Sequence, residues 1–348
     1  MVDATSKRDI RKLKLDELKE FFASRGEKPF RALQVYEWLW NKAAKDFDQM
    51  TNLSFPLREM LKENFTLHHI NVDRMQRSAD GTIKNAVTLF DGMVVESVLI
   101  PTEKRITACV SSQVGCSLAC KFCATAQLKR QRNLTPDEIY DQVVAIREQA
   151  QLYFGRPLTN IVFMGMGEPL LNYANVLSAI EKITSQKGLN MASKRITVST
   201  VGIAKMIMKM ADDGVKFNLA VSLHSALDKT RSSIMPINDT NPLSDLGDAL
   251  TYWYQKTKRK VTYEYVVWKG INDTEEHVNA LLKFCKIIPS KVNLIEYNPI
   301  DDGLFQQASD QALNMYMDIL ERHGVTTRIR KSRGKDIDAA CGQLANKT

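Results

Sequence analysis

Three cysteines lie close together in segment 115–123, at Cys116, Cys120 and Cys123. Their spacing is C-x3-C-x2-C, and Phe122 directly precedes the last thiol. Thiolates are soft ligands, so three of them on one short loop can bind a metal ion or an iron–sulfur cluster. A closed structural zinc site needs four ligands, whereas a site with one open position can carry out chemistry. The spacing therefore predicts a metal or cluster site with one coordination position left open.

The composition of the 348-residue chain, with 44% hydrophobic residues, is typical of a globular protein with a sizeable core. No run approaches the roughly 18–20 apolar residues of a membrane span, and residues 1–8 lack the apolar stretch of a secretory signal. We therefore expect a cytoplasmic protein without a membrane partner, in which clustered thiols indicate a metal or redox site. The net charge of +8 favours an anionic partner such as RNA.

The first hundred residues fall into two parts. Residues 1–70 carry apolar side chains at helical spacing and predict a helical N-terminal domain. Two Asp-Gly pairs follow, Asp80-Gly81 and Asp91-Gly92, each between segments that can alternate as strands. Asp-Gly favours a hairpin turn in which both central residues take positive φ. Residues 72–100 therefore predict a three-stranded meander.

From about residue 105, short β-branched runs alternate with helical stretches, which predicts an α/β fold with a parallel sheet and crossover helices. About six such repeats would form an open or partial barrel. The expected strands are 106–110, 160–164, 195–200, 217–223, 261–267, 292–297 and 325–329, and the expected helices are 136–150, 173–186, 242–257, 274–288 and 308–322. Working residues of parallel α/β folds gather at the C-terminal strand ends, and the polar motifs of this chain follow its predicted strands.

With these motifs in place, the chain resembles the radical S-adenosylmethionine (SAM) enzymes, which carry C-x3-C-x2-C after the first strand of a partial barrel. More narrowly it is similar to the RlmN/Cfr family, and within it to the RlmN-type adenosine C2 methyltransferases of 23S rRNA and tRNA. The matching segments are 28–32, 109–116, 163–172, 198–202, 222–224 and 336–344, and the resemblance extends over nearly the whole chain. Segment 128–131 departs from the family, which usually carries a glycine and an aromatic residue there.

This resemblance implies an architecture and a set of ligands. The architecture is a partial (β/α)6 radical SAM barrel at 102–335, an RNA-binding helical domain at 1–70, a β-meander linker at 71–101 and a C-terminal segment at 336–348. Cys116, Cys120 and Cys123 would hold one [4Fe-4S] cluster whose fourth iron binds SAM. The family's SAM contacts match Gly167, Glu168, Ser199, Ser222, Leu223, His224 and Asn298. The implied partners are 23S rRNA, tRNA and an electron donor such as flavodoxin, and the expected oligomeric state is a monomer.

The resemblance also implies a reaction that uses two SAM molecules per turnover. C2 of adenine is electron-poor and not nucleophilic, so radical addition replaces ordinary methyl transfer. Cys341 would carry the methyl as S-methylcysteine, and a radical from the second SAM would activate it for addition to C2, joining protein to RNA. Glu96 matches the family's general base, and Cys109 would release the product and leave a Cys109–Cys341 disulfide. The target adenosines would lie in the peptidyl-transferase centre of 23S rRNA and next to the anticodon of tRNA.

Other interpretations stay open at this point. Cys109 can be a plain core residue, Glu96 an exposed carboxylate on an alternating strand, and His224 a hydrogen-bonded structural histidine. A Cfr-type enzyme, which methylates C8 of the same rRNA adenosine, would share the cysteines. An RNA-binding protein with a structural zinc would instead recruit Cys109 or His224 as a fourth ligand.

Overall fold

The computed structural model describes residues 7–300 and 303–346. A ten-stranded sheet, in the order β14-β13-β12-β11-β10-β9-β6-β5-β4-β3, organises most of them. Its parallel strands are β6 (Ile106–Cys109), β9 (Asn160–Phe163), β10 (Ile196–Thr200), β11 (Asn218–Ser222), β12 (Val261–Val266), β13 (Ser290–Ile295) and β14 (Thr326–Arg330). The predicted α/β partial barrel is confirmed, and β14 continues the parallel sheet beyond six strands in the described part of the chain.

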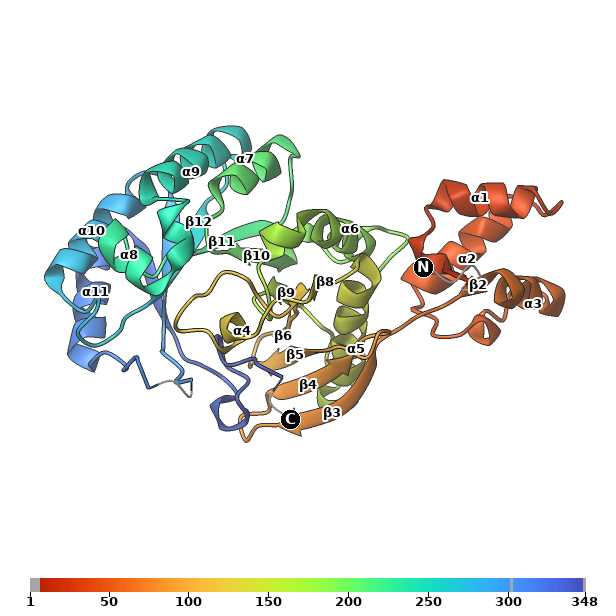
Figure 1. Cartoon of the computed structure of the whole chain (residues 1–348), viewed down its shortest axis with the longest axis horizontal. Coiled ribbons are helices and arrows are strands. Elements are labelled where there is room, and N and C mark those ends of the chain that lie inside the picture. Colours follow the sequence, from red (N-terminus) through yellow and green to blue (C-terminus); the bar gives the residue numbers. More distant parts are fainter. Residues whose placement is uncertain (1–6, 301–302, 347–348) are drawn as a thin grey trace.

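Helices cover the outside of this curved sheet (Figure 1). They are α5 (Pro136–Phe154), α6 (Tyr173–Thr184), α7 (Ala204–Asp212), α8 (Asp228–Ile234), α9 (Leu243–Thr257), α10 (Glu275–Cys285) and α11 (Asp310–Arg322). The sequence patterns did not single out α7 and α8, because both are short and neither begins with a side-chain cap. Helix α5 runs four residues past its predicted end, to Phe154, and the left-handed backbone of Gly155 closes the last turn. Within the described residues, every helix is too short or too polar to cross a membrane.

The N-terminal helices project from one side of the barrel (Figure 1). They are α1 (Leu15–Ala23), α2 (Phe30–Trp40) and α3 (Phe55–Asn64), accompanied by the paired strands β1 (Arg8–Asp9) and β2 (Phe65–Thr66). Arg11 joins this unit to α5, because its buried guanidinium lies 2.7 Å from Asp141 and 3.4 Å from Asp137. The remaining short elements are the 3-10 turns η1 (Ile10–Lys12), η2 (Phe47–Gln49), η3 (Pro169–Asn172), η4 (Ser193–Arg195), η5 (Pro236–Asp239) and η6 (Lys335–Ile337).

The meander consists of β3 (Asn71–Arg77), β4 (Ile83–Thr88) and β5 (Val94–Pro101), as predicted. Strand β5 pairs with β6, so the meander extends the barrel sheet itself. The predicted turn geometry is wrong, because only Gly81 (φ 85°) and Gly92 (φ 82°) have positive φ in the two Asp-Gly pairs. Each aspartate instead accepts a backbone hydrogen bond from two residues ahead, which favours a longer loop over a two-residue turn.

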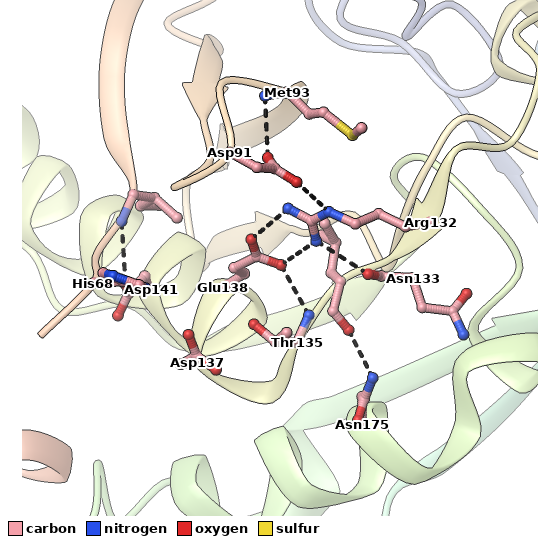
Figure 2. Close-up of polar contacts among 12 residues, drawn as sticks. His68, Asp91, Met93, Arg132, Asn133, Thr135, Asp137, Glu138, Asp141 and Asn175 are labelled. Carbon is pink, nitrogen blue, oxygen red and sulfur yellow. Dashed lines mark hydrogen bonds and ion pairs between the residues drawn. The ribbon is translucent and has the colours of Figure 1, made fainter. Parts of the chain in front are cut away.

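The loop that follows the three cysteines is fastened to two other elements through one arginine (Figure 2). Strand β8 (Arg132–Asn133) pairs with β7 (Gln113–Val114), which precedes the cysteines. The Arg132 guanidinium donates two 2.8 Å hydrogen bonds to Glu138 on α5, and its Nε lies 2.6 Å from Asp91 in the meander hairpin. Glu138 also accepts the backbone N–H of Thr135, so it caps α5 at the same time. Loop, hairpin and helix therefore form one connected unit.

We predict that Arg132→Ala lowers the free energy of unfolding by roughly 2–4 kcal/mol, because it leaves the buried Glu138 carboxylate without its cation. Urea unfolding under anoxia measures the change. Arg130→Ala is the matched control, because this exposed arginine two residues earlier makes a single 3.4 Å contact. Equal stability of the two variants would contradict the role given to Arg132.

Candidate functional site

The cysteine loop runs between β7 and the short helix α4 (Ala124–Gln127) at the C-terminal end of the barrel. Its path depends on Gly115, which has a φ of 73° and would place a Cβ only 2.5 Å from the carbonyl oxygen of Lys129. A side chain at this position would therefore push apart the two sides of the loop. The residues that depart from the family, 128–131, form the second side of this close approach, and Cys116 N–H donates to the Leu128 carbonyl at 3.2 Å.

The three thiols line one chamber, here called the upper chamber, which opens among the C-terminal strand ends. Burial raises the pKa of Cys116 to about 11, and it raises the pKa of Cys120 and Cys123 as well. Bound cations lower the free energy of such thiolates and so couple ligand binding to proton release. Among the described residues, no three Cys, His, Asp or Glu side chains converge on a point that a single metal ion would occupy. Three thiols on one short loop are the ligand set that an iron–sulfur cluster uses.

Six further residues, all predicted as SAM contacts, line the upper chamber with the cysteines. These six are Gly167, Glu168, Ser199, Ser222, His224 and Asn298. Gly167 has a φ of 93°, and a Cβ there would lie 2.5 Å from the Gln113 side chain, so a glycine is required. Leu223 differs from this set, because its side chain is buried in the main hydrophobic core between two chamber residues.

Glu168 is fixed at the chamber wall by backbone groups. Its Oε1 accepts the N–H of Leu170 and its Oε2 accepts that of Val201, both at 2.9 Å. Burial nevertheless raises the pKa of Glu168 to about 7, since these two bonds offset the desolvation only in part. The carboxylate still has free lone pairs with which it can accept a hydrogen bond from a ligand ammonium group.

His224 has one defined tautomer. Its Nδ1 accepts the backbone N–H of Val266 at 3.1 Å, so Nε2 carries the proton. Burial lowers the pKa of His224 to about 3, which keeps the ring neutral at physiological pH. The ring also meets Phe122, the aromatic residue of the cysteine motif, edge-on at 4.7 Å between centroids. His224 thus braces the cysteine loop and offers one N–H donor.

The C-terminal segment returns to the cysteine loop and brings Cys341 with it. The Gly342 carbonyl accepts the N–H of Ala124 at 2.7 Å, and the Asn298 side-chain amide donates to the Cys341 carbonyl at 3.2 Å. The other Asn298 side-chain atom, Oδ1, is buried without a hydrogen-bond partner in the described part of the chain. A buried acceptor of this kind is suited to a bound polar ligand, which supports a cofactor in the upper chamber.

Cys341 also lines a second chamber, here called the lower chamber, which extends toward the beginnings of the strands. Cys109, at the end of β6, lines this chamber only, whereas the three clustered cysteines line the upper one. Burial and the neighbouring Cys341 thiol raise the pKa of Cys109 to about 12. The two cysteines predicted to form a pair are therefore brought together, with Cys341 at the boundary of both chambers.

Glu96 lies apart from both chambers, although it is only 2% exposed. The interpretation of Glu96 as an exposed carboxylate is thus wrong. Its Oε2 accepts the backbone N–H groups of Ala345 (2.8 Å) and Asn346 (3.1 Å), and Lys84 Nζ lies 3.3 Å from Oε1. In this conformation Glu96 holds the segment that carries Cys341.

Sequence reasoning missed two residues of the site. Glu264 on β12 and Arg330 on β14 line both chambers, and their side chains approach within 3.7 Å. A glutamate inside an apolar strand run was a usable signal, because a buried charge requires a partner. Arg330 gave no such signal, because it lies in a run of basic residues, 328–335, that is typical of an exposed surface.

Comparison with known proteins identifies the family. Residues 8–67 match the model of the ribosomal RNA large subunit methyltransferase N-terminal domain, and residues 110–285 match that of the radical SAM superfamily. The chain is 67% identical over 342 residues to a probable dual-specificity RNA methyltransferase RlmN of Christiangramia forsetii, covering 98% of this chain and 97% of that protein. An RlmN of Salinibacter ruber is 46% identical and covers 94% of this chain and 91% of that protein.

Among solved structures, a radical SAM methyltransferase from Sphaerobacter thermophilus superimposes with a TM-score of 0.91 at 39% identity. The match covers 97% of this chain and 99% of that one. For a radical SAM enzyme the family implies SAM and a [4Fe-4S] cluster, and the thiols and the upper chamber fit both. The chain belongs to the RlmN family of radical SAM RNA methyltransferases.

Proposed function

We propose that the protein methylates C2 of adenosine in 23S rRNA, at the peptidyl-transferase centre, and in tRNA, next to the anticodon. The observation that carries this proposal is the position of Cys341, which lines both chambers and neighbours Cys109. A methyl carrier has to meet its methyl donor and its acceptor in turn, and a residue at the boundary of two chambers can do so. The relatives named as dual-specificity RNA methyltransferases support two classes of RNA substrate.

In this proposal Cys116, Cys120 and Cys123 hold the cluster, and the six predicted SAM contacts that line the upper chamber hold SAM. When bound, the cluster and SAM supply a methyl group and a carbon-centred radical. The Cys341 thiolate attacks the methyl carbon, so that a new C–S bond forms while the bond to the donor sulfur breaks. Once the methyl carbon has lost a hydrogen atom to the radical and is joined to adenine C2, the adduct loses the C2 proton and one electron, which the cluster would accept. The Cys109 thiolate then attacks the Cys341 sulfur, so that the S–S bond forms while the Cys341 S–C bond breaks, and the released carbon takes up a proton to complete the methyl group. The methylated RNA leaves, and a disulfide remains that needs two electrons, from a donor such as flavodoxin, before the next turnover.

Glu96 is proposed as the base that removes the C2 proton. Because Glu96 Oε2 accepts two amide hydrogen bonds from residues 345 and 346, this role requires the C-terminal segment to release it. The same segment carries Cys341, so release would also give the methyl carrier freedom to follow its substrate. Glu96 is thus proposed to alternate between holding the C-terminal segment and accepting a proton.

The RNA is proposed to approach through the lower chamber. This chamber is lined by the cations Arg105, Lys291, Arg328, Arg330, Lys331 and Arg333, against Glu264 as its one acidic lining residue in the described chain. Basic side chains of this kind bind phosphates in a salt-dependent manner. The target base would have to leave its stack to reach Cys341. The N-terminal unit, residues 1–70, is proposed as an additional RNA-binding domain.

The first prediction concerns the product. Anaerobically reconstituted protein, given SAM, a reductant and unmodified 23S rRNA or tRNA, should yield 2-methyladenosine in nucleoside mass analysis. Detection of 8-methyladenosine without 2-methyladenosine would show a Cfr-type activity instead. Protein that purifies under anoxia with one zinc and no iron or sulfide would support the structural-zinc alternative.

A second prediction concerns the methyl carrier. Cys341→Ala should reduce RNA methylation below detection while the iron and sulfide content stays within about 20% of wild type, because Cys341 is not among the proposed cluster ligands. Cys285→Ala is the matched control, since this buried cysteine on α10 lines neither chamber. Methylation at the wild-type rate by Cys341→Ala would contradict the carrier role.

A third prediction separates Cys109 from Cys341. Cys109→Ala should still form the protein–RNA bond but should not resolve it, so a covalent adduct should accumulate as a slow-migrating, ribonuclease-sensitive band on denaturing gels. The double variant Cys109→Ala/Cys341→Ala should form no adduct, because it lacks the carrier. Free methylated RNA at normal rate from Cys109→Ala would argue against its release role.

A further inference from the structure

Glu264 is a buried carboxylate whose hydrogen bonding is incomplete. The residue is 4% exposed, and its Oε1 accepts the Asn293 side-chain amide at 2.9 Å. Its Oε2 has no hydrogen-bond partner among the described residues, and Nη1 of Arg330 lies 3.7 Å away, beyond hydrogen-bond distance. Leaving an acceptor of a buried carboxylate unpaired is costly, so native structures rarely retain one without a ligand. Because Glu264 lines both chambers, this oxygen is available to a molecule bound there.

Arg330 connects this carboxylate to the methyl carrier. Its side chain lines both chambers together with that of Cys341, and it shares the lower chamber with Cys109. The side chain is 32% exposed, and it faces the same chambers as Glu264. Three chemically different groups therefore follow one another across the site: an unpaired acceptor on Glu264, a fork of donors on Arg330, and the sulfur of Cys341.

We propose that Glu264 and Arg330 read one edge of the target adenine and so direct a single ring carbon toward Cys341. Glu264 Oε2 accepts a hydrogen bond from the N6 amino group, and Arg330 donates to the adjacent ring nitrogen. This inference rests on the proposed function, because it takes an RNA adenine as the substrate. It adds that the side chains of Glu264 and Arg330 select the target base and orient it.

The order of groups on adenine matches the order in the site. Along one edge of adenine a donor (N6), an acceptor (N1) and C2 follow one another, and along the other edge N6, N7 and C8 do so. Guanine places the O6 acceptor where Glu264 requires a donor and an N1–H donor where Arg330 requires an acceptor. Both contacts then become repulsive, and a site built to hydrogen-bond its substrate rejects such a base strongly.

The experiment uses reconstituted protein and synthetic anticodon stem-loop RNAs that differ only at the target base. The bases are adenine, purine (which lacks N6), 1-deazaadenine and 7-deazaadenine. For wild type, purine should lower both kcat/KM for methylation and RNA affinity in fluorescence anisotropy by about 5–150-fold, the usual cost of losing specific base contacts. A loss with 1-deazaadenine but not with 7-deazaadenine identifies the C2 edge, and the reverse pattern identifies the C8 edge.

The decisive comparison is between protein variants. In Glu264→Ala the preference for adenine over purine should fall to within about 2-fold, while SAM binding by equilibrium dialysis and cluster content stay unchanged. Glu264→Gln keeps the shape of the side chain and should show an intermediate preference, which keeps the test valid if Glu264→Ala is unstable. Glu181→Ala, which removes an exposed carboxylate from α6, should keep the full wild-type preference.

Three results would overturn the inference. Wild-type protein that methylates purine as well as adenine RNA would remove its basis. Loss of SAM binding in Glu264→Ala with the base preference intact would place Glu264 in the cofactor site instead. Wild-type protein that methylates no RNA at all would contradict the proposed function itself, and the inference would fall with it.

Discussion

The chemistry of this protein depends on holding the C-terminal segment against the cysteine loop. The two segments are more than 200 residues apart in sequence, yet the Ala124 N–H donates to the Gly342 carbonyl and the Thr125 hydroxyl to the Leu344 carbonyl. Glu96 adds two further hydrogen bonds to residues 345 and 346. A bond between neutral groups contributes about 0.5–1.5 kcal/mol net and a bond to the Glu96 carboxylate about 1.5–3 kcal/mol, so the segment is held in place but can still be released. That balance suits a methyl carrier that has to serve two chambers.

Buried polar groups give the rest of the site its rigidity. Arg231, which is fully buried, donates to the carbonyls of Leu223 and Val201 and thereby ties together two strand-end loops of the upper chamber. Burial lowers the pKa of Arg231 to about 10, still well above neutral, so the cation persists. Arg132 does the same for the loop behind the cysteines. Buried charges with satisfied hydrogen bonds define one arrangement of the loops, because another arrangement would leave a buried charge without partners.

Two side-chain oxygens of the chambers lack a hydrogen-bond partner among the described residues. Asn298 Oδ1 and Glu264 Oε2 lie inside a site whose other polar atoms are mostly satisfied. A buried amide or carboxylate oxygen without a hydrogen bond lowers the stability of the fold, but it can accept a hydrogen bond from a bound ligand. Residues with satisfied hydrogen bonds, such as Arg231 and Arg132, therefore stabilise the loops of the site, whereas Asn298 and Glu264 are available to bind a ligand.

Local sequence patterns predicted most elements of the fold. Alternating strand and helix periodicity located the barrel and the start of α5, because this signal depends on near neighbours alone. The Asp-Gly pairs located both hairpins but not their geometry, since aspartate side-chain hydrogen bonds favoured a longer loop. The motifs named Cys109, Cys341 and the cysteine loop, while Glu264 and Arg330 were missed because their importance comes from facing each other across β13.

The sequence by itself determined the ligand chemistry: three thiols on one loop, a further cysteine near the end of the chain, and an excess of positive charge. Residue types and short spacings are enough for that, because they fix which bonds a side chain can make. Only the tertiary structure decided that Cys341 stands between two chambers and that Glu96 is buried beneath the C-terminal segment. It also decided that Glu264 keeps an oxygen without a hydrogen-bond partner among the described residues. These properties depend on contacts between segments that are distant in sequence. Burial and hydrogen bonding at such contacts are set by how the strands and loops pack together.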